Sequence, residues 1–209
     1  MQRLKNTLEY LRTRKESVVA AILIAVAMGV FIKLCRFIDR PVVDDALISI
    51  GYARSFADGD GFRLTRASEI SEGFSNPVWT FVLAFFEKLH FNTIATAKSL
   101  GMWLAALSLP LMAAWGPLSQ ERKLQLEDTI APAFACSNAT FAYWALGGLE
   151  VGQLVFSIAL FGAFLFAPRT RRTAIAAGLS GAALALTRPE AALYVAAVFA
   201  IGPGLLTNT

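Results

Sequence analysis

Two adjacent carboxylates, Asp44 and Asp45, are the side chains of this chain best placed to do chemistry. They begin residues 44–57, in which apolar residues recur at helical spacing. One carboxylate can act as a general base toward a hydroxyl group while its neighbour tunes it or contributes to a cation site. Adjacent residues point in different directions along a helix, so the two need not share one role. The alternative interpretation is that both stabilise the start of a helix through capping and the helix dipole.

Three further polar motifs interrupt the apolar sequence. Glu72 and Asn76 precede a proline suited to the first position of a helix, and Asn76 fits a helix cap as well as it fits a ligand contact. Glu150 follows two glycines and a leucine in a predicted turn, while Arg188 and Glu190 flank a proline between two short apolar segments. An arginine can pair with a carboxylate there or bind a phosphate through two hydrogen bonds. These five residues are candidate substrate-binding residues.

The composition indicates a membrane protein. Of the 209 residues 56% are hydrophobic, and the mean hydropathy is +0.55. The net charge of +4 comes from Lys and Arg residues that gather at the ends of apolar segments, as in the positive-inside pattern. No basic stripe carries interleaved aromatics, which excludes nucleic acid as the expected partner. Cys35 and Cys136 fall in apolar segments and are interpreted as buried packing residues, with a disulfide between them left open.

The N-terminal part divides into a basic segment, a span and a loop. Residues 1–17 are predicted to form a basic cytoplasmic segment, and residues 18–37 are long enough to cross a bilayer, at about 30 Å. A cleaved signal peptide is the alternative, but the apolar run continues past the small residues that resemble a cleavage site. Residues 38–91 then form an extracytoplasmic loop with two predicted interfacial helices, at 44–57 and 77–91.

The distribution of arginines and lysines decides the remaining topology. If residues 77–91 crossed the membrane, the basic residues near 122 and 169–172 would lie outside, against the positive-inside rule. If residues 77–91 lie in the interface, the rule is satisfied, with spans at about 96–115, 129–146, 151–167, 174–187 and 191–206. The expected fold is therefore an all-α, polytopic integral membrane protein with about six transmembrane helices and two interfacial helices. Charge parity then places all the acidic candidates and Asn76 at one extracytoplasmic surface.

Four motifs in order resemble polytopic glycosyltransferases of the GT-C class. They are Asp-Asp-Ala-Leu-Ile-Ser-Ile-Gly-Tyr-Ala-Arg at 44–54, Ser-Glu-Gly-Phe-Ser-Asn-Pro-Val-Trp at 71–79, Gly-Leu-Glu at 148–150 and Leu-Thr-Arg-Pro-Glu at 186–190. The resemblance is closest to mycobacterial-type terminal arabinofuranosyltransferases. It covers nearly all of this sequence but about the first third to half of a typical family member. Residues 18–209 are therefore expected to be a truncated GT-C-like transmembrane module.

The resemblance implies a function and a location. It implies transfer of a sugar from a polyprenyl-phosphate donor to a glycan or lipid acceptor at the extracytoplasmic face of the cell membrane. The general base of the class falls on Asp44 or Asp45, with Asp44 slightly preferred because it aligns with the aspartate of the family's Asp-Glu variant. Glu150 and the segment from Arg188 to Glu190 match the later conserved motifs of the class. A divalent cation, Mg²⁺ or Mn²⁺, is a candidate cofactor.

A non-enzymatic membrane protein is the alternative function. It would be a transporter, an assembly partner or an inactive truncated remnant that uses the same fold to bind lipid or protein. Charged residues within the spans would favour transport, and this sequence has few of them.

Overall fold

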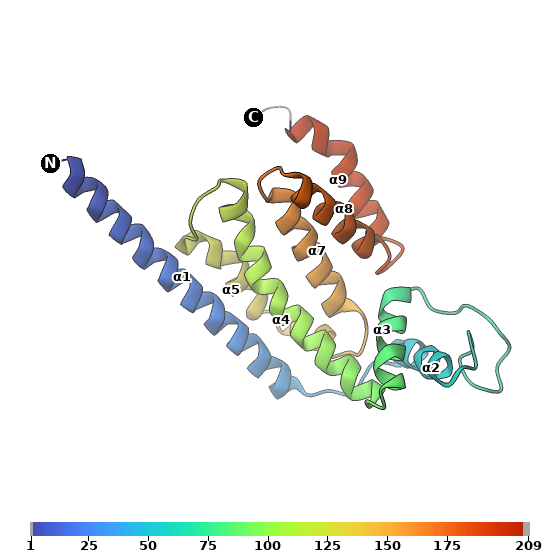
Figure 1. Cartoon of the computed structure of the whole chain (residues 1–209). Coiled ribbons are helices and arrows are strands. Elements are labelled where there is room, and N and C mark those ends of the chain that lie inside the picture. Colours follow the sequence, from blue (N-terminus) through green and yellow to red (C-terminus); the bar gives the residue numbers. More distant parts are fainter. Residues whose placement is uncertain (1, 207–209) are drawn as a thin grey trace.

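A computed structural model describes the backbone of residues 2–206 and the side chains of residues 11–200, and this part of the chain is all-helical (Figure 1). Helix α1 runs without a break from Gln2 to Ile38. At 1.5 Å per residue it is about 55 Å long, nearly twice the thickness of a bilayer core. The predicted basic segment and first span are therefore parts of one helix, and its section Leu11–Ile38 is long and apolar enough to cross a membrane.

Helix α4, Thr93–Ser119, is the second helix that meets the length and composition of a span within the described residues. Helices α7 (Val151–Phe166), α8 (Arg171–Ala185) and α9 (Ala191–Leu206) coincide with the other predicted apolar segments. At 15 or 16 residues they are shorter than the roughly 20 residues that a perpendicular span needs. The structure thus confirms an all-helical chain with two candidate spans, and the count of six stays a prediction.

The predicted single helix over residues 129–146 is wrong. The structure has a short 3₁₀ turn, η1 (Leu126–Thr129), followed by α5 (Ile130–Cys136) and α6 (Ala139–Ala145). The break has a local cause, since the side chain of Asn138 accepts a hydrogen bond from the backbone N–H of Phe141 and caps α6. Two helices of seven residues replace one apolar span.

The two helices predicted for the loop at 38–91 are present. Helix α2 runs from Asp44 to Asp58 and ends at Gly59, whose φ of +87° suits glycine. Helix α3 runs from Pro77 to Lys88. Figure 1 shows both at the far end of the bundle from the chain's N-terminus, beside the turn that leads into α7. The loops after α4 and α7 lie at the opposite end of the bundle, and the direction in which the helices cross a membrane stays a prediction.

The interior of the bundle joins segments far apart in sequence. Phe31 and Cys35 of α1 pack with Leu109 of α4 and Ala142 of α6. Cys35 and Cys136 are both buried, and neither forms a disulfide. The interpretation of both cysteines as buried packing residues is confirmed.

Helices α4 and α7 touch through glycine backbones, which gives a prediction about stability. A Cβ atom added to Gly152 would lie 2.1 Å from the carbonyl oxygen of Gly101, so Gly152→Ala must push the helices apart. We expect it to lower stability by about 1–3 kcal/mol, measured as thermal unfolding in detergent. The matched control is Gly178→Ala on α8, where an added Cβ meets nothing within 4 Å. This variant should leave the midpoint of thermal unfolding unchanged or raise it. Equal midpoints for the two variants would contradict the close contact.

Candidate functional site

A cavity of about 200 Å³ opens where α2, the start of α3 and the start of α7 meet. All four sequence motifs contribute to its wall. Its polar lining residues are Asp45, Ser49, Ser75, Asn76, Glu150 and Arg188. Four of these six residues are predicted site residues from stretches separated by as many as 143 positions, which makes this cavity the candidate functional site.

Glu150 is the buried centre of the site, with 3% of its surface exposed. Its Oε2 accepts a hydrogen bond from Nδ2 of Asn76 at 2.5 Å, and its Oε1 lies 3.2 Å from Nε of Arg188. The same Nε lies 2.8 Å from Oε1 of Glu190. It forms an aligned hydrogen bond to neither Glu150 nor Glu190. A buried carboxylate is stable only when paired and hydrogen-bonded. The amide and the guanidinium together provide this for Glu150.

Asn76 is held by three side chains. Its Oδ1 accepts hydrogen bonds from the hydroxyls of Ser49, at 3.0 Å, and Thr80, at 3.1 Å. Because the oxygen faces two hydroxyl donors, the NH₂ group must face Glu150. Asn76 stands at the N-cap position of α3 but makes no side-chain capping bond. Capping therefore does not explain this side chain, and its partners do.

Trp79 of α3 is fully buried, and its Nε1 donates to the carbonyl oxygen of Gly148 at 2.9 Å. The backbone N–H of Val43 donates to the carbonyl oxygen of Gly147 at 2.9 Å. These two bonds fasten α3 and the start of α2 to the turn that carries Glu150.

The two candidate bases occupy different positions. Both are exposed in the first turn of α2, where no side chain caps the helix. Asp45 lines the cavity, whereas Asp44 is not among its lining residues. Glu72 is exposed and likewise does not line it, and half-buried Glu190 reaches the site through Arg188.

A second cavity, of about 630 Å³, borders the first. The two share Asp45, Leu149 and Arg188. The rest of its wall is mostly apolar and includes Phe141, Trp144 and Leu154. Asp45 and Arg188 therefore stand between a small polar space and a larger apolar one.

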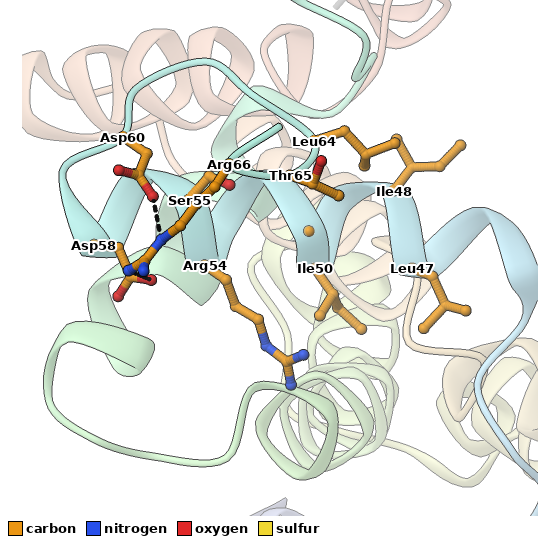
Figure 2. A pocket seen from close by; sticks show the side chains of 11 residues that line it. Leu47, Ile48, Ile50, Arg54, Ser55, Asp58, Asp60, Leu64, Thr65 and Arg66 are labelled. Carbon is orange, nitrogen blue, oxygen red and sulfur yellow. Dashed lines mark hydrogen bonds and ion pairs between the residues drawn. The ribbon is translucent and has the colours of Figure 1, made fainter. Parts of the chain in front are cut away.

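A third cavity, of about 510 Å³, lies along α2 and the loop that follows it (Figure 2). Figure 2 shows Arg66 between Asp58 and Asp60, while Arg54 points away from them. Arg66 lies 2.9 Å from Asp60 and 3.2 Å from Asp58, and these carboxylates, Asp60 first, raise the pKa of Arg66 above its usual value. Its acidic groups are already paired, so this cavity is a poorer place for a base than the one beside Asp45.

The residues of the site do not form a recognisable cation site. Within the described side chains, no three His, Cys, Asp or Glu residues gather where they could hold a metal ion. Both oxygens of Glu150 already face Asn76 and Arg188. We therefore assign no chemical step to Mg²⁺ or Mn²⁺, and the requirement for either stays a prediction.

Ser49, Thr80 and Leu149 belong to the site but were not predicted from the sequence. Ser49 lies four residues after Asp45, so both fall on one face of α2. Thr80 has the same spacing from Asn76 on α3. This i, i+4 spacing was the signal that could have found both hydroxyls. Leu149 has no such signal.

The fold and the site together define an all-helical protein with two helices long and apolar enough to cross a membrane. At its site the buried carboxylate of Glu150 and the buried amide of Asn76 lie beside the partly exposed guanidinium of Arg188 and the exposed Asp45. No protein-family model, no curated protein and no solved structure matches the chain.

Proposed function

We propose that this chain is the module of a multi-pass membrane glycosyltransferase that moves a sugar from a polyprenyl-phosphate donor to a hydroxyl group of a glycan or lipid. The observation that carries the proposal is the meeting of the four motifs at one cavity, with an exposed aspartate next to the ion pair of the buried Glu150 with Arg188. Arabinofuranose is the proposed sugar, on the resemblance alone.

In the proposed reaction Asp45 is the general base. Its carboxylate accepts the proton of the acceptor hydroxyl, whose oxygen attacks the anomeric carbon from the side opposite the phosphate. The bond from the anomeric carbon to the phosphate oxygen breaks, and the polyprenyl phosphate leaves with the electron pair. One glycosidic bond forms with inverted configuration.

Arg188 is the proposed phosphate-binding residue. It borders both cavities and is 36% exposed, and its guanidinium has five N–H donors, more than two nearby carboxylates require. Its charge would stabilise the leaving phosphate. The larger cavity, with Phe141, Trp144 and Leu154 in its wall, suits the first isoprene units of the donor.

The proposed topology places the N-terminus in the cytoplasm and the site at the extracytoplasmic face. Arginines near 122 and at 169–172 gather at the end of the bundle opposite α2 and α3, which supports this orientation (Figure 1). Helices α2 and α3 would then lie in the outer interface.

The test measures sugar transfer in membranes that contain the intact enzyme. Polyprenyl-phosphoryl arabinofuranose with a radiolabelled sugar is the donor, and polyprenyl-phosphoryl mannose is the comparison. We expect the wild type to transfer label to glycan and the double variant Asp44→Asn, Asp45→Asn to lose transfer. Glu69→Gln, which removes an exposed carboxylate of the same loop, is the control and should keep it. Undiminished transfer by the double variant would overturn the assignment of the base to this pair, whereas absence of transfer by the wild type would favour the non-enzymatic alternative.

A further inference from the structure

A groove of about 430 Å³ lies between the N-terminal half of α1 and η1. That half of α1 is far from α2 and α3, which border the candidate site (Figure 1). Its wall consists of Leu11, Arg12, Lys15, Glu16, Val19 and Leu126. Nothing in the proposed reaction uses these residues.

The η1 side of the groove is fixed by a network of polar contacts. Ser17 of α1 donates a hydrogen bond to the carbonyl oxygen of Leu124 at 2.7 Å. Arg122 binds both carboxylate oxygens of Asp128, at 2.7 and 2.8 Å, and Asp128 accepts a further bond from the backbone of Gln125. The groove is therefore a built feature of the fold and not a gap beside a loose loop.

The wall of the groove carries two cations, Arg12 and Lys15, and one carboxylate, Glu16, while the two carboxylates of the network lie against Arg122. Burial alone would raise the pKa of Asp128, but the bonds from Arg122 and Gln125 hold it below its usual value, so Asp128 is ionised and paired. Glu127 also lies 2.7 Å from Arg122. On the facing wall Arg12 and Lys15 are exposed, and no ion pair joins either to another described residue.

Apolar surface continues from the groove along both helices. Past Leu126, the side chains of Ile130 and Phe134 on α5 are 68% and 74% exposed. On α1, Val19 and Ile22 are 46% and 57% exposed. Val19 lies seven residues past Arg12, about 10 Å along the axis. Cations at one end and exposed apolar side chains further along match the order of phosphate and acyl chains in a phospholipid.

We propose that this groove is a binding site for one anionic phospholipid, with Arg12 and Lys15 on its phosphate and its acyl chains over Val19, Leu126 and Ile130. Basic pockets at the edge of membrane-spanning helices attract anionic headgroups. In the proposed topology the lipid belongs to the cytoplasmic leaflet. The site requires that α1 crosses the membrane, but it does not depend on glycosyl transfer.

The test uses the purified full chain in phosphatidylcholine nanodiscs that contain spin-labelled phosphatidylglycerol. The fraction of label held immobile at the protein gives its association relative to labelled phosphatidylcholine. We expect a preference for phosphatidylglycerol that falls about fivefold with Arg12→Gln and about fivefold again with Lys15→Gln added. Glu16→Gln removes the one carboxylate of the groove wall and should raise the preference.

Arg14→Gln is the matched control, because it removes the same charge from the same helix but from a residue outside the groove wall. It should change the preference by much less than Arg12→Gln. An equal loss would mean general surface attraction and would overturn the site, as would equal association of the two lipids with the wild type. Displacement of the label by millimolar glycerol phosphate would show a site for small anions and would also overturn it. Helical content by circular dichroism confirms that each variant is folded, and sugar transfer is not the readout.

Discussion

Asp45→Asn is expected to lower the rate of sugar transfer by about 100- to 10,000-fold, the usual contribution of a general base. Asp44→Asn is expected to change it far less. The reason is position, since Asp45 lines the cavity beside Arg188 and Glu150, whereas Asp44 does not. The measurement is the initial rate of transfer from polyprenyl-phosphoryl arabinofuranose, with kcat and KM determined separately. A lost base should lower kcat with little change in KM for the donor.

The comparison of these two variants is internally controlled. Both remove one exposed carboxylate from the first turn of α2, so both weaken the favourable interaction with the helix dipole to a similar degree. A purely structural role would make the two variants behave alike. A larger loss with Asp44→Asn would return the base to the residue that the resemblance slightly preferred, and would contradict our assignment of Asp45.

The sequence could predict the helix that carries Asp44 and Asp45, but not which of the two faces the cavity. Adjacent residues on a helix differ in direction by about 100°, so the position of α2 relative to its neighbours decides which one faces the cavity. That position depends on two bonds to the turn at residues 147–148, from Val43 and Trp79. Neither bond is visible in local periodicity. The sequence nonetheless predicted α2 closely, from the spacing of its apolar residues.

Asn76 and Asn138 also show what local sequence rules cannot decide. Each precedes a helix and could cap it, and local rules do not distinguish them. Asn138 does cap α6, and this divides the predicted span over residues 129–146 into two helices. Asn76 instead turns toward Ser49, Thr80 and Glu150, because a buried carboxylate 74 residues away requires a donor. Only the tertiary contacts could separate a cap from a site residue.

The other large expected effect concerns the ion pair at the centre of the site. Arg188→Met should destabilise the protein by about 3 kcal/mol, because it leaves the buried carboxylate of Glu150 without its cation. We take the lower end of the range for a buried pair because the side chain of Arg188 is 36% exposed. Unfolding in detergent measures the change. Arg66→Met is the control, since Arg66 is 77% exposed and ion pairs at the surface contribute little to stability.

Adding Glu150→Gln to Arg188→Met separates the structural role of Arg188 from its proposed role at the phosphate. A neutral glutamine still accepts the hydrogen bond from Asn76 but needs no cation, so the double variant should regain most of the lost stability. It should not regain sugar transfer, because the guanidinium proposed to bind the phosphate is still missing. Recovery of both would make Arg188 only a partner for Glu150. If Arg188→Met lowered stability no more than Arg66→Met, the ion pair between Arg188 and the buried Glu150 would be contradicted.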